Sequence, residues 1–299
     1  MSERRDDGNP NRFPHEREAG RLGRARTPAD IPRQKEITSI GFPSAAIYKI
    51  GQPQRPPIRH DNGFLERFRR REPTFSDYTR LAKWKAMLEG AEALRPDLTD
   101  GLAAYRHFLE GEGEPRQFSY ERYVMNDNSG QITLKNAIFD IQKGVMEIWK
   151  NQSPKTTSLY SFELTGSAIA CGRNNPSFPY PVTENWQKAI GAHFIWLSGR
   201  VKVITPRNNG TPSFQMVLTL HAEDRYNFNP GAADIATGIP DEDNGVFEIT
   251  GLAHQYDHFS TLVREVKWSG IKYLGGVSSP IHHERHRQPS DNRRIRNRV

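Results

Sequence analysis

The stretch HAEDRYNFNPG, residues 221–231, holds the densest group of polar side chains in the sequence. Glu223 and Asp224 are carboxylates, and oxygen ligands of this kind bind hard cations such as Mg²⁺. Tyr226 follows Asp224 by two residues, so the two side chains share one side of an extended strand. We predict either a catalytic and metal-binding site at the end of a strand, or a turn closed by Asn-Pro-Gly with a surface ion pair.

The order Asp224-x-Tyr226-Asn227-Phe228-Asn229 resembles the signature of the colicin M-type bacteriocins. A second segment, FEITGLAHQY at 247–256, is similar to an apolar-Gly-Leu/Ala segment of that family that an aromatic residue follows. The resemblance covers residues 190–270. It implies a C-terminal β-rich domain that hydrolyses lipid II, a lipid-linked cell-wall precursor, with the help of Mg²⁺.

The resemblance also implies roles for single residues. Asp224 would be a Mg²⁺ ligand or the catalytic acid, with Glu223 as a second ligand, and Tyr226 would orient Asp224. The family has a second Asp directly after the Tyr, where this chain has Asn227. An amide cannot act as a general base. The family's Arg beyond the turn has no counterpart here, and the acidic residue in that region is Asp234.

Three other motifs have simpler interpretations. In HQYDH, His254 and His258 would share a helix face and could bind a metal, but we favour a surface turn, because Gln255 replaces the Glu of the zinc-protease pattern. IPDEDNG, 239–245, lacks the spacing of a Ca²⁺ loop and is predicted as a turn. The histidines in SPIHHERHRQP, 279–289, could bind metal only adventitiously.

The single cysteine and a group of aromatic residues are predicted to lie mainly in a hydrophobic core. Cys171 is the single cysteine, so no intrachain disulfide forms, and a small buried hydrophobe is favoured over a nucleophilic thiol. Trp186, His193 and Trp196 could form a platform for a carbohydrate or a lipid headgroup, but we favour core packing.

Helical periodicity comes before strand alternation along the chain. We predict helices over 75–96, with Ser76 as N-cap, over 98–109 and over 132–151. Shorter alternating runs predict strands, and Phe214, Met216, Leu218 and Leu220 mark one that is half buried. The expected fold class is α+β, with a helical N-terminal and middle part before a C-terminal antiparallel β-sandwich or small β-barrel. The predicted strands are 158–171, 190–204, 213–222, 246–251 and 261–268.

Composition divides the 299 residues into four segments. We expect a basic, largely disordered or extended arm over 1–72, a helical domain over 73–153, a β-rich domain over 154–278 and a basic flexible tail over 279–299. The arm carries 16 Lys/Arg against 10 Asp/Glu, whereas residues 73–279 carry 20 against 23. The body therefore lacks the charge of a sequence-specific nucleic-acid reader, while the tails could bind anionic surfaces without specificity.

The sequence leaves two classes of function open. No transmembrane segment or N-terminal hydrophobic signal is found, so we expect a chain made in the cytoplasm that could leave the cell only by a signal-peptide-independent route. The first class is a toxin-like or effector-like hydrolase of phosphodiester or pyrophosphate bonds, with an immunity or carrier protein as partner. The second is a non-enzymatic binding or assembly module, such as a secretion-system or tail-associated component.

Overall fold

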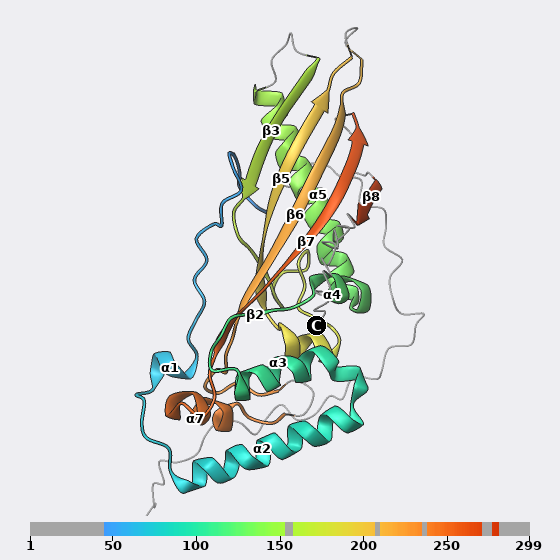
Figure 1. The fold of residues 1–299 in the computed structure, drawn as a ribbon. Coiled ribbons are helices and arrows are strands. Elements are labelled where there is room, and N and C mark those ends of the chain that lie inside the picture. Colours follow the sequence, from blue (N-terminus) through green and yellow to red (C-terminus); the bar gives the residue numbers. More distant parts are fainter. Residues whose placement is uncertain (1–44, 153–157, 207–209, 235–237, 271–276, 281–299) are drawn as a thin grey trace, which may run out of the picture. The chain divides into compact units, whose positions relative to one another are not determined.

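The computed structural model describes residues 45–152, 158–206, 210–234, 238–270 and 277–280. The predicted disorder of residues 1–39 and the tail beyond residue 280 lie outside these residues. Figure 1 shows the helices α1 (Phe64–Arg67), α2 (Phe75–Leu94), α3 (Thr99–Glu110), α4 (Tyr120–Asn126), α5 (Asn128–Gln152), α6 (Glu184–Ala189) and α7 (Glu242–Thr250), and the short 3₁₀ turn Pro96–Leu98. The strands are β1 (Tyr48–Ile50), β2 (Arg116–Gln117), β3 (Leu159–Gly166), β4 (Ile169–Cys171), β5 (His193–Ile204), β6 (Ser213–Tyr226), β7 (Tyr256–Ser269) and β8 (Val277–Pro280).

The described strands form one mixed, open sheet with the order β1-β3-β5-β6-β7-β2. In addition, β4 pairs with β5 and β8 pairs with β7. All neighbours are antiparallel except the short pair of β2 with β7. The α+β class is therefore confirmed. The sandwich or barrel is not confirmed, because the two edges of the sheet do not meet and helices, not a second sheet, cover its buried face.

The core lies between this sheet and α5, which Figure 1 shows behind the long strands. Phe214, Met216, Leu218 and Leu220 are buried, as the alternation predicts, while Gln215 and Val217 between them are exposed. On α5 the predicted stripe faces the sheet: Ile141, Val145 and Ile148 are buried, and Leu134 and Ile138 pack against them. Gly199 of β5 leaves room for the helix, since a Cβ there would lie 3.2 Å from Cδ1 of Ile141.

Helices α3 and α5 lie close to the ranges predicted for them, 98–109 and 132–151. Helix α2 begins at the predicted residue, but its N-cap differs. Thr74, not Ser76, is the N-cap of α2, because its side chain and that of Asp77 form a reciprocal capping box. Arg71 donates to the same carboxylate at 2.7 Å and holds the pKa of Asp77 well below its usual range. Of the helices in the described residues, none is long and apolar enough to cross a membrane.

Two sequence predictions near the C-terminus are wrong. VFEIT of the predicted strand VFEITG belongs to helix α7, which begins at Glu242, within the predicted turn IPDEDNG. The helix ends at Thr250, and its C-cap Gly251 has the left-handed conformation (φ 70°). A run of six residues is too short for its period to separate helix from strand. HQYDH is not a surface turn, because Tyr256 starts β7 and His258 lies within it, fully buried.

The helical and β-rich segments share one hydrophobic core. Tyr120 and Val145, from residues 73–153, and Leu164 and Val266, from residues 154–278, belong to the same buried cluster. Contacts also group the described residues in a single compact unit. The change of composition at residue 153 therefore marks a change of secondary structure inside this unit.

The described part of the basic arm is mostly without helix or strand. After β1 pairs with β3, residues 53–62 continue without helix or strand and reach α1. Asp140 of α5 fixes the start of this segment: its carboxylate accepts hydrogen bonds from the backbone of Ala45, from the backbone of Ala46 at 3.2 Å and from the hydroxyl of Tyr48 at 2.8 Å.

Replacing Asp140 by Ala should detach the start of the arm. Three donors lose a buried acceptor, and each such loss costs on the order of 1 kcal/mol or more. We expect the free energy of unfolding to fall by about 2–4 kcal/mol in urea denaturation. Glu147→Ala, an exposed change on the same helix, should stay within about 0.5 kcal/mol of the wild type. Equal stability of the two variants would contradict this anchoring role.

Candidate functional site

Strand β6 continues through the polar stretch that the sequence places at its end. Its pairing with β7 runs without a break from Ser213↔Ser269 to Tyr226↔Tyr256. Successive side chains of a strand point to opposite faces of the sheet. Asp224 and Tyr226 therefore share the face of the buried residues Leu220 and Ala222, and Glu223 and Arg225 share the other face.

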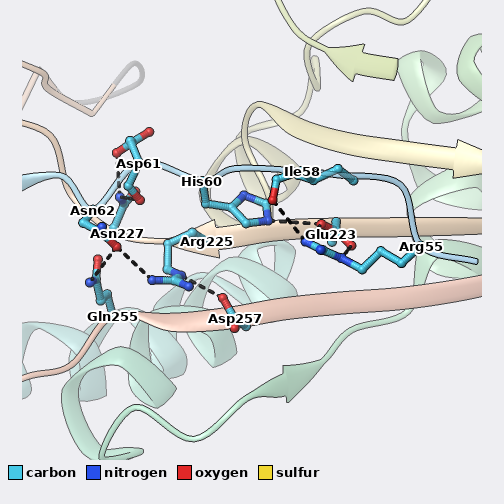
Figure 2. Close-up of polar contacts among 10 residues, drawn as sticks. All are labelled: Arg55, Ile58, His60, Asp61, Asn62, Glu223, Arg225, Asn227, Gln255 and Asp257. Carbon is cyan, nitrogen blue, oxygen red and sulfur yellow. Dashed lines mark hydrogen bonds and ion pairs between the residues drawn. The ribbon is translucent and has the colours of Figure 1, made fainter. Parts of the chain in front are cut away.

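On that other face the polar residues bind the arm, as Figure 2 shows. Glu223 accepts a two-point contact from Arg55, at 2.6 and 2.8 Å, and its Oε1 lies 3.3 Å from Nε2 of His60. Arg225 donates to Asp257 at 2.7 Å and to Asn62 at 3.0 Å. Glu223 thus attaches the arm, and the structure does not bring it together with Asp224 as a pair of metal ligands.

Asp224 faces a cavity of about 1020 Å³ at the end of the sheet. The walls come from the arm, from α2, α3 and α6, from the loop after β4 and from the loop after β6. Tyr226 and Asn227 line the same cavity, so three of the predicted site residues meet there. Further lining groups include aromatic rings and charges from distant segments, among them Asp61, Trp84, Tyr105, Arg173, Tyr180, Lys188, Asp234 and Asp241.

The carboxyl group of Asp224 is partly buried in this cavity. Burial raises its pKa well above the usual range for Asp, a hydrogen bond from the backbone of Arg225 opposes the shift, and the negative charge of Asp61 adds to it. Desolvation disfavours the charged form of an acid, so Asp224 keeps its proton at pH values where an ordinary Asp has lost it. A protonated carboxyl group in a cavity can donate a proton to a bound molecule.

Tyr226 forms part of an aromatic wall beside this acid. Its ring stacks on Tyr256 with centroids 5.1 Å apart and lies 6.1 Å from Phe108. Burial raises the pKa of Tyr226 well above its usual value, so the phenol stays neutral. The hydrogen bonds of the described residues do not join Tyr226 to Asp224, and the predicted orienting role stays a prediction. Its position supports a packing role for the ring.

Asn227 uses its side chain to hold the arm. Its amide donates to the carboxylate of Asp61 at 2.7 Å and to the backbone carbonyl of the same residue at 3.1 Å. Asn227 thus links the cavity wall to a residue 166 positions earlier in the chain.

Several groups of the cavity carry no local signal in the sequence. Tyr180 lies close to three carboxylates: burial raises its pKa, and the charges of Asp224, Asp234 and Asp241 add to the increase. Arg173 opposes that shift and lies over the Tyr180 ring, 5.3 Å from the centroid. The sequence shows only that Arg173 and Tyr180 lie in a Pro- and Asn-rich segment that predicts a loop, and binding and catalytic residues are frequent in loops.

Asp234 is placed in the cavity by the loop that follows β6. It forms an ion pair with Lys188 of α6, whose side chain also lies 3.5 Å from Glu184. Asp234 is therefore neutralised by a neighbouring cation and is not a second free acid beside Asp224.

The predicted Mg²⁺ site does not fit this arrangement. Glu223 and Asp224 lie on opposite faces of β6, and burial favours the protonated form of Asp224, whereas a hard cation needs ionised oxygen ligands. Among the described residues no three His, Cys, Asp or Glu side chains form a group that could hold a metal ion. We therefore assign no chemical step to Mg²⁺.

The remaining histidine, cysteine and tryptophan candidates are structural. Nε2 of His258 lies 2.9 Å from Arg116, and burial lowers the pKa of His258 to about 3. Cys171 is buried, as predicted, and burial raises the pKa of its thiol. Trp186 is buried in the hydrophobic core, in agreement with core packing. Trp196 is buried on the opposite sheet face to the core residues Ile195 and Leu197, where it stacks on His221 with centroids 3.6 Å apart.

Comparison of the chain with protein-family models, with curated proteins and with solved structures finds no match. The likeness to colicin M-type bacteriocins therefore rests on the quoted residues alone.

A second buried acid lies behind the cavity wall. Glu248 of α7 is 3% exposed, one carboxyl oxygen accepts the backbone N–H of Phe228 at 3.1 Å, and the other has no partner among the described residues. Burial raises the pKa of Glu248 to about 8, and the charges of Asp241 and Asp61 contribute.

Glu248 should make the protein less stable as the pH rises. The folded state keeps a proton that the unfolded chain loses near its ordinary pKa of 4.5, so stability is full below that value and declines until the pH passes about 8. We expect Glu248→Gln to remove a slope of up to about 1.4 kcal/mol per pH unit over this window. Urea denaturation at several pH values measures this, with Glu265→Gln on β7 as the control. Parallel curves for wild type and Glu248→Gln would contradict it.

Proposed function

We propose that this protein is a hydrolase that cleaves a phosphodiester or pyrophosphate bond in the cavity, with Asp224 as the proton donor to the leaving oxygen. The observation that carries the proposal is a partly buried carboxyl group of raised pKa that faces a cavity of about 1020 Å³. General acids of this kind contribute roughly 10²–10⁴-fold to a rate. The cavity is large enough for a substrate rather than a single water molecule.

Arg173 supports an anionic substrate. The other Lys and Arg side chains that line the cavity are paired with acids: Arg59 with Glu66, Arg95 with Asp97 and Glu184, Lys188 with Asp234, and Arg225 with Asp257. The recorded partner of Arg173 is the ring of Tyr180, which leaves the N–H edge of the guanidinium able to bind phosphate oxygens.

The aromatic wall favours a substrate with an apolar or ring-containing part beside the phosphate. Trp84, Tyr105, Tyr226 and Phe228 line one region of the cavity, and such rings provide flat apolar surface with polar edges. The likeness to colicin M-type bacteriocins selects a lipid-linked cell-wall precursor as the first substrate to test. In this proposal the protein is toxin-like or effector-like, and an immunity or carrier protein would be its partner.

A non-enzymatic binding or assembly role is the second candidate, and α2 supports it. Four large apolar side chains of this helix are exposed, with Phe75 at 88% and Leu94 at 80%, together with Tyr78 and Met87. Exposed apolar residues of this size are common where proteins bind each other. Size-exclusion chromatography with light scattering tests this role, which predicts a defined oligomer or complex.

Asp224→Asn separates catalysis from folding. Asn cannot donate a proton, so we expect hydrolysis of lipid II or of a soluble pyrophosphate analogue to fall at least about 100-fold. The same change should raise the free energy of unfolding at pH 8, because it removes an acid that is costly to ionise in the folded state. Product release measured by chromatography, and urea denaturation, give the two values.

Glu265→Gln is the matched control for Asp224→Asn. Glu265 is an acid on the exposed face of the neighbouring strand, pairs with Lys267 and does not line the cavity, so both rate and stability should stay at wild-type values. A wild-type protein that leaves every tested phosphate ester and pyrophosphate intact would contradict the hydrolase proposal, as would full activity of Asp224→Asn.

A further inference from the structure

The arm is fastened to the residues that directly follow the site strand. Asn62 accepts a bond from Arg225, and the backbone N–H of Phe64 donates to the carbonyl of Phe228 at 3.3 Å. Between them Gly63 has φ +50°, and a Cβ at this position would lie 2.0 Å from the carbonyl oxygen of Phe228. Only glycine allows so close an approach at this backbone angle, so the arm crosses this point in one fixed path.

This path brings Asp61 to the cavity. One oxygen of its carboxylate, Oδ1, accepts the amide of Asn227 at 2.7 Å and the backbone N–H of Gly63 at 3.0 Å. Both bonds fall on Oδ1, and the side chain is exposed and lines the same cavity as Asp224. Its charge acts on Asp224, whose pKa it helps to raise.

We propose that Asp61 is the second acid–base residue of the cavity, the acceptor that complements the proton donor Asp224, and that Asn227 positions it. This assignment rests on the proposed hydrolase function. It makes the arm a part of the site rather than a tether, because the site has its second carboxylate only while the arm is attached to β6.

The two carboxyl groups account for each proton in the reaction. Asp61 takes a proton from a water molecule as the water oxygen forms a bond to phosphorus. The bond from phosphorus to the leaving oxygen breaks, its electron pair stays on that oxygen, and the oxygen takes the proton of Asp224. The products are two molecules with the added elements of one water, and exchange with solvent returns the proton from Asp61 and restores the one on Asp224.

The amide of Asn227 is suited to this positioning role. An amide nitrogen donates hydrogen bonds, and here both of its contacts reach acceptors on Asp61. A carboxylate at position 227 would offer no donor and would repel the charge of Asp61. Asn227→Asp should therefore move Asp61 away from its place, although the change adds an acid to the cavity wall.

The experiment uses the full chain and compares Asp61→Asn, Asn227→Asp and Asp224→Asn with Glu66→Gln. Glu66 is an exposed acid on α1, five residues after Asp61, and does not line the cavity. We expect Asp61→Asn to lower turnover at least about 100-fold and to remove the acidic limb of the pH–rate profile, with no loss of melting temperature. Asn227→Asp should lower turnover about 10-fold or more, and Glu66→Gln should match the wild type.

A second readout needs no substrate. Carbodiimide modifies protonated carboxyl groups, so mass spectrometry at several pH values reports the proton on Asp224, whose charged neighbours are Asp61, Arg225 and Asp257. Removal of the Asp61 charge should shift the midpoint of this labelling to lower pH, because that charge helps Asp224 to keep its proton. An unchanged midpoint in Asp61→Asn would overturn the proximity on which the assignment rests.

The outcomes separate the two proposals. If Asp61→Asn keeps at least half of the wild-type turnover while Asp224→Asn loses it, the role of Asp61 is overturned and the hydrolase remains. If the wild-type protein shows no turnover on any phosphate ester or pyrophosphate, the hydrolase proposal fails, and the catalytic role of Asp61 fails with it.

Discussion

The uninterrupted pairing of β6 with β7 as far as Tyr226↔Tyr256 is the constraint on which the site depends. Because side chains alternate along a strand, this register decides the face on which each polar residue lies. It sends Glu223 and Arg225 to the arm and Asp224 to the cavity. A shift of the pairing by one residue would turn Glu223 and Arg225 toward the cavity and Asp224 toward the solvent.

The two faces meet where the arm turns around the end of β6. Contacts of Glu223 and Arg225 hold the arm on one face of the sheet, and Asn227, directly after β6, holds Asp61, which lines the cavity. The partly buried Asp224 and the buried Glu248 lower the free energy of unfolding, because both side chains lose favourable solvation on folding. Groups of perturbed pKa in a cavity are typical of functional sites, where folded stability is reduced in exchange for reactivity.

The regular part of the fold could be predicted from the sequence, and the site only in part. Strict alternation from Phe214 to Leu220 predicted β6, and the 3.6-residue period predicted α5. The continuation of β6 through residues 223–226 was missed, because polar residues on both faces hide the alternation when one face meets an arm and the other a cavity. The prediction that Asp224 and Tyr226 share one side of a strand is confirmed, because they stand two residues apart on β6.

Other parts of the site depend on long-range contacts that no local pattern contains. Asp61 lies 166 residues before Asn227, and nothing in the composition of the arm separates it from the arm's other acids. The pairing of Glu223 with Arg55 and His60, which removes Glu223 from any metal site, is equally non-local. Helix α7 was missed for a different reason: its apolar run is short, and its start lies inside a segment rich in turn-forming residues.

The central claim is that burial in the cavity raises the pKa of Asp224 well above that of an ordinary Asp, and its titration is the most direct test. Carbon-13 NMR of the side-chain carboxyl groups in aspartate-labelled wild-type protein, with the Asp224 signal assigned by its absence in Asp224→Asn, gives that pKa. The account predicts a value well above the ordinary ~3.9 of an Asp side chain. A midpoint at or below ~3.9 would contradict it, because Asp224 would then be an ordinary surface carboxylate with no proton to donate.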